Sequence, residues 1–206
     1  MSPASPSSPT SPARRPGYGE RRGVLVQAAI RVVAAQGIAG LSHRSVAREA
    51  GVTHGLVRHH FGTMTSLIAE ALDTILPQSL RQNPVSLLLA EPERPEEDLV
   101  TWIDEQADLQ VFEYEMLLAT RHTPELRPLA EHLYRGYEDS VRSAFAEHGL
   151  PAPSDAHVTL ILAAIEGLVL HRVTFRRDDG PTITDAFVAL RAAIRLAVAA
   201  DEFPPP

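Results

Sequence analysis

The sequence predicts an all-α protein in which an N-terminal three-helix domain is followed by a helical body, with about nine helices in total. Alanine and leucine, both strong helix formers, dominate the composition together with valine. Apolar residues recur at helical spacing, and few segments show the alternation that strands require. The 206 residues are 44% hydrophobic and 22% charged, which is normal for a soluble globular protein that buries a core.

Cap and glycine signals place four helices in the first 80 residues. Residues 1–17 are rich in Ser and Pro and are expected to be disordered. The expected helices are 20–36 (ended by Gly37), 43–50 (capped by Ser42 and ended by Gly51), 54–60 (capped by Thr53), and a fourth from Thr63 to about residue 80. We expect residues 18–64 to form one domain, and the fourth helix, about 64–80, to connect it to the body, 65–206.

Prolines and acids between residues 82 and 95 predict a loop with a single helical turn at 85–89. The expected helices of the body are 96–107, 108–121, 124–147, a helix capped by Ser154 that reaches Phe175, and a last one from Thr182 or Thr184 to about Ala200.

The charge is divided unevenly along the chain. The net charge is −7, yet residues 1–61 hold eight arginines against two acids, a net charge of +6. The remaining residues hold 11 arginines against 24 acids, a net charge of −13. A basic module on an acidic body is the electrostatic pattern of a protein that binds a polyanion. The chain has no lysine, and its richness in Arg, Ala, Pro and Gly points to a GC-rich bacterial genome.

Residues 42–61 predict a helix-turn-helix. Two short helices that cross steeply need a small residue at the crossing and a positive φ at the turn, and Ala47 and Gly51 meet these needs. The apolar residues expected to pack inside are Val46, Ala50, Val52, Leu56, Val57 and Phe61. The other side chains are His, Arg, Thr and Ser, which can bind phosphates or base edges. An ordinary helical hairpin is the alternative, but the spacing and the charge together favour DNA binding.

Residues 20–76 resemble the DNA-binding domain of the tetracycline-repressor (TetR) family of transcriptional regulators. The matching features, in order, are Gly37-Ile38-Ala39-Gly40-Leu41, the Ser-rich start of the second helix, Val46-Ala47, Ala50-Gly51-Val52, Thr53, Gly55 and His60-Phe61. The resemblance implies a DNA-binding regulator, a repressor that a small-molecule effector releases from its operator. The alternative is a helical small-molecule-binding or scaffold protein without DNA affinity.

The resemblance also implies where DNA is contacted. The carried-over residues are Ser42, His43, Arg44, Thr53, His54, Arg58, His59 and His60. Arg58 stands where the family usually has Tyr, and Met64 stands near its usual Lys. Arg58 can replace a phosphate contact or read guanine with its planar guanidinium, whereas Met64 can do neither. His60 is equally interpretable as a structural residue. Arg14 and Arg15 either form an arm over a DNA groove or belong to a solvated tail.

The resemblance implies that the body binds a ligand and forms a homodimer on a palindromic double-stranded operator. The helix 157–175 is apolar on nearly every face, so we expect one side to meet the core and the other a partner. The last helix has an apolar stripe, and the two helices together form the expected interface unless both complete a monomer core. Candidate ligand-binding residues are Trp102, Phe112, Tyr114, Met116, Arg121, His122, Tyr137, Phe145, Glu166, His171 and Phe175. Glu166 stands out because a carboxylate on an apolar helix needs a partner, which is His171, an arginine or an effector.

Several classes of protein are not indicated. There is no cysteine, so disulfides and cysteine chemistry are excluded. No pair of histidines has the spacing of a helical metal site, and no phosphate-binding or nucleophile motif occurs, so neither a metal, a cofactor nor an enzyme is expected. The apolar run from Val158 to Leu170 is broken by Glu166 and is too short for a bilayer. We expect a cytoplasmic protein with no membrane contact.

Overall fold

The computed structural model describes residues 18–81, 84–90, 95–175 and 182–200, and every regular element within them is helical. The α-helices are α1 (Tyr18–Gln36), α2 (His43–Glu49), α3 (His54–Phe61), α4 (Met64–Arg81), α5 (Pro84–Leu89), α6 (Pro95–Glu105), α7 (Ala107–Ala119), α8 (Arg127–Glu147), α9 (Asp155–Phe175) and α10 (Ile183–Ala199), with 3-10 turns η1 (Ile38–Gly40) and η2 (Pro124–Leu126). The all-α fold class is confirmed. The expected tail, with Arg14 and Arg15, lies outside the described residues.

The described chain has ten α-helices rather than the expected nine because α5 is a helix and not a single turn. Val85, Leu88 and Leu89 of α5 are all buried. Side chains three and four residues apart lie on one helical face, and that face packs against α6 and α8. Tertiary packing therefore stabilises a helix that is too short to persist alone.

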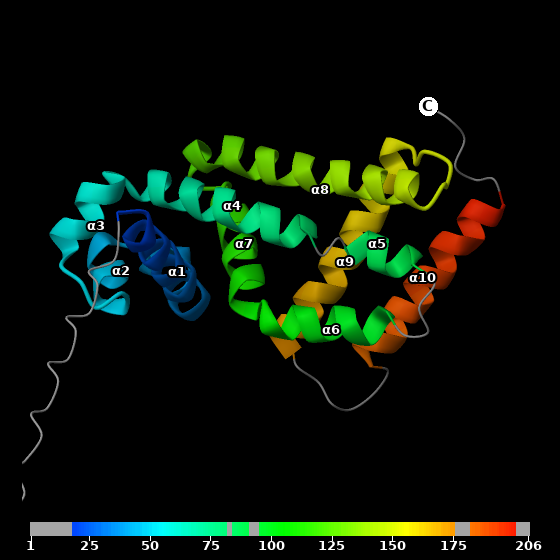
Figure 1. The fold of residues 1–206 in the computed structure, drawn as a ribbon, viewed down its shortest axis with the longest axis horizontal. Coiled ribbons are helices and arrows are strands. Elements are labelled where there is room, and N and C mark those ends of the chain that lie inside the picture. Colours follow the sequence, from blue (N-terminus) through cyan, green and yellow to red (C-terminus); the bar gives the residue numbers. More distant parts are fainter. Residues whose placement is uncertain (1–17, 82–83, 91–94, 176–181, 201–206) are drawn as a thin grey trace, which may run out of the picture.

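The molecule is elongated (Figure 1), with α1, α2 and α3 gathered at one end and α10 at the other. α4 leads from the three-helix end into the body and lies along α8. α7 lies between the two parts and packs against α1 on one side and α9 on another. A shift of α7 would therefore change its contacts with α1 in the three-helix part and with α9 in the body.

The helix-turn-helix forms as the sequence predicts. Ser42 caps α2 through a capping box with Ser45, which satisfies backbone donors at the start of this short helix. Gly51 has φ of 66°, the left-handed conformation that ends α2 without a steric penalty. Ala47 is 4% exposed, while Val46 and Val57 have no exposed surface, so the two helices cross closely over their apolar sides.

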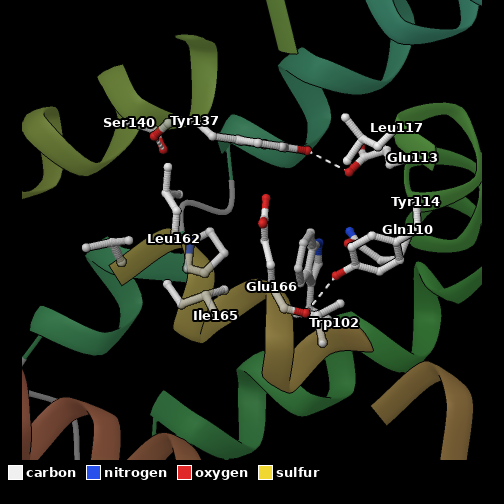
Figure 2. Close-up of a pocket in the computed structure, with 13 residues that line it drawn as sticks. Trp102, Gln110, Glu113, Tyr114, Leu117, Tyr137, Ser140, Leu162, Ile165 and Glu166 are labelled. Atoms are coloured by element: carbon white, nitrogen blue, oxygen red, sulfur yellow. Dashed lines mark hydrogen bonds between the residues drawn. The ribbon is translucent and has the colours of Figure 1, made fainter. Parts of the chain in front are cut away.

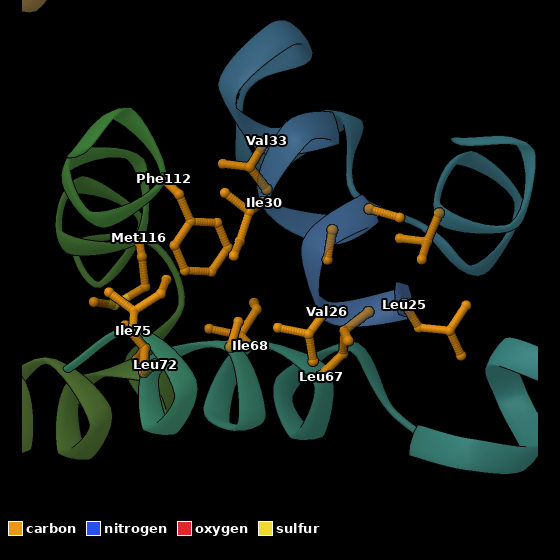
Figure 3. Close-up of a cluster of buried hydrophobic side chains, with 14 of the residues drawn as sticks. Leu25, Val26, Ile30, Val33, Leu67, Ile68, Leu72, Ile75, Phe112 and Met116 are labelled. Atoms are coloured by element: carbon orange, nitrogen blue, oxygen red, sulfur yellow. The ribbon is translucent and has the colours of Figure 1, made fainter. Parts of the chain in front are cut away.

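A first hydrophobic core joins the helix-turn-helix to the body. Figure 3 shows α1 side chains facing residues of α4 and α7 across this core. Its central members are Leu25, Val26, Ile30 and Val33 of α1, Leu67, Ile68, Leu72 and Ile75 of α4, and Phe112 and Met116 of α7. The domain boundary near residue 64 stays a prediction, and this core extends across it.

A second hydrophobic core lies in the body. It is built by α5, α6, α8, α9 and α10, and its largest fully buried side chains are Phe145 and Phe187. α9 runs through this part with Val158, Ile161, Ile165 and Val169 buried along one face. α7 supplies members of the first core and also packs on α9, so the two cores are separated by one helix.

The φ of Gly51 gives a test of the turn. Gly51→Ala is expected to lower the free energy of unfolding by about 1 kcal/mol, because a Cβ is strained at positive φ. No heavy atom lies within 4 Å of that Cβ, so crowding cannot be the cause. Gly55 in α3 is the matched control, since it also has open space but a helical backbone. Gly55→Ala is expected to leave stability unchanged or raise it by up to about 1 kcal/mol. Equal effects in urea denaturation would contradict this account.

Candidate DNA-binding face and ligand cavity

The solvent-facing side of α2 and α3 is basic and polar. Its exposed residues are Ser42, Arg44, Arg48, Thr53, His54, Arg58 and His59. Glu49 is the acid of α2, and its carboxylate accepts a hydrogen bond from Arg31 of α1 at 2.7 Å. This ion pair offsets the negative charge at the edge of the face. The face therefore presents arginines and hydrogen-bonding groups, which suit phosphate oxygens and base edges.

Three of the residues predicted to contact DNA, Ser42, His43 and Thr53, differ in their local hydrogen bonding. Ser42 Oγ accepts from the Ser45 amide at 3.1 Å, and the Ser42 amide donates to Ser45 Oγ at 2.9 Å. His43 is half-buried, and its Nε2 has no hydrogen-bond partner within the described chain. Thr53 stands at the N-cap position of α3, as predicted, but its side chain makes no capping hydrogen bond. The Thr53 hydroxyl is therefore exposed and is not used to cap α3.

His60 differs from the other residues predicted to contact DNA, because its side chain is only 8% exposed. Its ring lies beside those of His59 and Phe61, at centroid distances of 5.7 and 6.3 Å. Burial lowers the pKa of His60 below its ordinary value, and positive charges on α1 and α3 lower it further. Of the two interpretations of His60, this burial favours the structural residue over the DNA contact. Helical spacing turns this residue toward the core, and it serves as a neutral packing group.

Arg22 of α1 holds α3 and α4 together. Its guanidinium donates to both carboxylate oxygens of Glu70 in α4, at 3.0 and 2.7 Å. A third bond runs to the carbonyl oxygen of His60 at 3.0 Å, and the guanidinium carbon lies 4.7 Å from the centre of the Phe61 ring. These hydrogen bonds from Arg22 lower the pKa of Glu70. A residue that sequence analysis counted only as basic charge thus positions the C-terminal end of α3.

A cavity of about 60 Å³ lies in the body and is lined by residues of α5 to α9. Its lining residues are Pro84, Val85, Trp102, Gln110, Glu113, Tyr114, Leu117, Tyr137, Ser140, Leu162, Ile165, Glu166 and Val169. Figure 2 shows the Glu166 side chain projecting from α9 toward the side occupied by Tyr137, with Trp102 and Tyr114 nearby. The cavity is mostly apolar and holds a few polar groups, which is the usual character of a small-molecule site.

Tyrosine hydroxyls hold the polar groups of the cavity. Tyr137 donates to Glu113 Oε2 at 2.8 Å, and Tyr134 donates to Glu166 Oε2 at 2.9 Å. Tyr114 donates to the backbone carbonyl of Glu166 at 2.9 Å. Burial raises the pKa of the Glu166 carboxyl, and the bond from Tyr134 lowers it by a smaller amount. Burial and the nearby carboxylates raise the pKa of both Tyr114 and Tyr134, so these tyrosines remain neutral hydrogen-bond donors.

The structure sorts the residues predicted to bind ligand. Trp102, Tyr114, Tyr137 and Glu166 line the cavity. The others lie elsewhere: Phe112 and Met116 are fully buried in the first core, Phe145 is fully buried in the second, Arg121 and His122 are exposed after α7, and His171 and Phe175 are exposed near the end of α9. These seven residues therefore do not line the cavity, and their part in ligand binding stays a prediction. Their aromatic or polar character was visible in the sequence, but the side of the helix that each occupies depends on packing.

Two polar residues of the cavity were missed by sequence analysis. Gln110 and Glu113 of α7 are 7% and 4% exposed. They lie three residues apart, so they share the cavity-facing side of a helix that is apolar on average. The signal was the one that singled out Glu166, a polar group within an apolar helix. Within the described residues, no cluster of three His, Asp or Glu that could hold a metal occurs.

α7 also carries a direct link to the helix-turn-helix. The Glu115 carboxylate accepts a hydrogen bond from the Ile38 amide in η1 at 2.9 Å. A Cβ at Gly37, whose φ is 69°, would lie 3.1 Å from the same carboxylate oxygen. Glycine is therefore favoured at position 37 both by the positive φ and by the close approach of the Glu115 carboxylate. Glu113 faces the cavity and Glu115 bonds η1, so one turn of α7 contacts both the cavity and the turn that leads into α2.

The outer faces of α9 and α10 are apolar. Of seven large hydrophobic side chains that are exposed in the described chain, five lie on these helices: Leu160, Leu170, Phe175, Val188 and Leu196. α9 also has the length and mean hydropathy, 1.7 over 18 residues, of a membrane-crossing helix, although 28% of that window is buried within the protein. Core helices of soluble proteins can have the same length and hydropathy, so this composition does not by itself indicate a membrane. An exposed surface of this kind marks a contact with another molecule.

Two known protein families match this chain, one in each part of the molecule. Residues 25–71 match the family described as bacterial regulatory proteins, tetR family. Residues 96–200 match the family described as the tetracyclin repressor-like C-terminal domain. The two matches together include the helix-turn-helix and most of the body.

Two transcriptional regulators are related over part of their length. An 88-residue segment is 31% identical to the HTH-type transcriptional regulator BetI of Agrobacterium fabrum, and it covers 43% of each chain. A 56-residue segment is 38% identical to the HTH-type transcriptional regulator PksA of Bacillus subtilis and covers 27% of each chain. The matched segments thus span less than half of these relatives.

Solved structures resemble the whole described fold. A TetR-family regulator from Rhodococcus sp. superposes with a TM-score of 0.68 at 21% identity, over 87% of this chain and 99% of that chain. The multidrug binding protein EbrR, solved in complex with ethidium, superposes with a TM-score of 0.58 at 30% identity, over 85% of this chain and 99% of that chain. EbrR has also been solved with proflavin.

The buried carboxyl of Glu166 makes a prediction about pH and stability. Its raised pKa means that the folded protein binds this proton more tightly than the unfolded chain does, so Glu166 destabilises the fold as pH rises above its unfolded pKa. Glu166→Gln is expected to stabilise the protein by about 1 kcal/mol near pH 7.5, allowing for partial solvent screening, and by little at pH 4. Thermal unfolding at both pH values measures this difference. A gain that is equal at both pH values would contradict the raised pKa.

Proposed function

Because the chain belongs to the tetR family of bacterial regulatory proteins, we propose that it is a ligand-responsive repressor of the cytoplasm. Its dimer binds a palindromic operator, and a small molecule in the body weakens that binding. Members of this family are DNA-binding transcriptional regulators with ligand-binding C-terminal domains, and no catalytic role is invoked for any residue of this chain. Occupation of a promoter by such a dimer blocks transcription until the effector arrives.

The exposed face of α2 and α3 carries the proposal. Arg44 and Arg58 are exposed, while the apolar sides of the same helices are buried against α1 and each other. The Arg22 contacts with Glu70 and the His60 carbonyl hold α3 in place from behind. We propose that α3 enters the major groove, with Arg58 and His59 on the groove side and Ser42 and Arg44 at its edge. His43, Thr53 and His54 complete the proposed contact set, and His60 is left out.

Homodimerisation through α9 and α10 accounts for their apolar outer faces. Leu160 and Leu196 are 67% and 71% exposed, values that are unfavourable for large hydrophobic side chains in a soluble chain. An isologous pairing of both helices forms a four-helix interface about a two-fold axis. The same axis relates two recognition helices, whose half-sites lie about one helical turn, ~34 Å, or more apart. A membrane-crossing role for α9 fits less well, because Glu166 lies at its centre and α7, α8 and α10 pack along it.

We propose that the cavity binds the effector and that α7 transmits its presence. EbrR is a multidrug binding protein, which supports a small molecule as the ligand of the body. Glu113 and Tyr114 lie on the cavity side of α7, and Glu115 bonds the turn between α1 and α2. A ligand that shifts α7 changes the setting of η1 and the spacing of the two DNA-binding heads. The operator then loses affinity because only one spacing fits successive grooves.

Selection of binding sites from random duplex DNA tests the regulator proposal. We expect enrichment of a two-fold symmetric site whose affinity falls steeply with salt, since arginine contacts release counterions. Arg58→Ala is expected to weaken binding to that site by about 1–3 kcal/mol. Arg135→Ala on the exposed side of α8 is the matched control, and we expect it to change affinity little. Failure to enrich any duplex at low salt would instead favour a helical binding or scaffold protein without DNA affinity.

Loss of the Glu115 bond tests coupling through α7. Glu115→Ala is expected to weaken operator binding by roughly 2–10-fold, because a backbone bond worth about 0.5–1.5 kcal/mol no longer holds η1. Glu115→Gln keeps an acceptor oxygen and is expected to retain most of the affinity. Glu115 lies outside the proposed DNA face, so we expect both variants to keep the salt dependence of operator binding unchanged. Wild-type affinity in Glu115→Ala, measured by fluorescence anisotropy, would rule out this link.

A further inference from the structure

The polar groups of the cavity define which ligands it can accept. Glu113 and Glu166 are its charged lining residues, and neither arginine nor histidine is among the described residues that line it. Lysine is absent from the whole sequence. Glu113 is 4% exposed, and Glu166 projects from the middle of α9. Two carboxyl groups in an apolar space are unfavourable as anions unless a proton or a positive charge offsets them.

Aromatic rings surround these carboxyl groups. Trp102, Tyr114 and Tyr137 come from three different helices and lie on the same cavity (Figure 2). Aromatic faces attract cations, and cages of such rings recognise quaternary ammonium groups. An anion in this space meets two carboxyl groups and the negative faces of the rings. A neutral molecule gains contact area alone and brings no positive charge to the two carboxyl groups.

We propose that the effector of this protein is a lipophilic organic cation, whose positive charge is held by Glu166 and Glu113 and whose body contacts the rings of Trp102, Tyr114 and Tyr137. This inference rests on the proposed function and identifies the chemical class of its ligand. The hydroxyls of Tyr134 and Tyr137 donate to the carboxyl groups of Glu166 and Glu113, respectively. A bound cation stabilises both carboxylates, so the hydrogen bonds from Tyr134 and Tyr137 can break and the two side chains can change rotamer.

The size of the cavity links cation entry to α7. Its volume of about 60 Å³ is well below the roughly 300–1,000 Å³ of drug-sized pockets, so a ligand must enlarge it. The Tyr137–Glu113 bond joins α8 to α7 across the space that the ligand needs. Breaking that bond frees α7 to move relative to α8. The Glu115–Ile38 bond lies two residues further along the same turn of α7 and passes the movement to η1.

Fluorescence of Trp102, the only tryptophan of the chain, tests the proposal directly. The probe is benzyltrimethylammonium, and its neutral isostere neopentylbenzene and the anion benzylsulfonate are the comparison ligands. We expect saturable quenching by the cation, with affinity higher by about tenfold or more than for the neutral isostere, and no saturation by the anion. Equal affinity for the cation and its isostere, or the absence of saturable binding by the cation, overturns the proposal.

Two variants test whether Glu166 recognises the positive charge of the ligand. Glu166→Gln is expected to weaken cation binding by about tenfold or more and to change binding of the neutral isostere less than about twofold. Asp139→Asn removes one negative charge from the exposed side of α8, and we expect it to leave both affinities unchanged. Retained cation affinity in Glu166→Gln overturns the role of Glu166. If that variant does not fold, the wild-type comparison of cation with isostere still decides the ligand class.

Operator binding in the same samples separates this inference from the proposed function. Weakened operator binding in the presence of the cation supports both. Operator binding that persists together with absent cation binding overturns the cation class and leaves the regulator proposal standing. Cation binding without affinity for any duplex overturns the regulator proposal instead.

Discussion

The burial of α1 on two sides at once is the constraint on which the rest of the structure depends. One side of α1 packs on α2, and the other packs on α4 and α7. A helix that is apolar around most of its circumference must be enclosed by neighbours. The DNA-binding helices are therefore not an independent module on a tether. Their orientation is set by the same hydrophobic core that receives Phe112 and Met116 from the body.

Polar contacts set the relative angles of the helices, which the apolar packing alone leaves adjustable. The apolar core brings α1, α3 and α4 together, and the directional bonds of Arg22 to Glu70 and to the His60 carbonyl set their relative angle. On the opposite side of the domain, the Glu115 bond to the Ile38 amide plays the corresponding role for η1. Hydrophobic contact is non-directional, whereas hydrogen bonds are sensitive to small displacements. A switch between two orientations of the heads is better controlled by the second kind of contact.

α7 connects the chemistry of the two sites. Its mean composition is apolar, yet successive residues serve different neighbours: Phe112 enters the first core, Glu113 lines the cavity, and Glu115 reaches η1. A helix turns by about 100° per residue, so a single turn can contact three environments. This arrangement is the route by which the proposed effector would act on the DNA-binding helices.

The sequence by itself determined the helical class, the helix-turn-helix and the positions of Ser42, Ala47 and Gly51, because caps, crossings and turns depend on residues close together in the chain. It also singled out Glu166, since a carboxylate on an apolar helix is a local anomaly. Tertiary structure decided what depends on distant neighbours. Packing turned His60 inward, made α5 a helix, sent Phe112 to the core and placed Glu113 in the cavity. On a helix buried from several sides, periodicity marks which residues are apolar but does not tell which neighbour each side will meet.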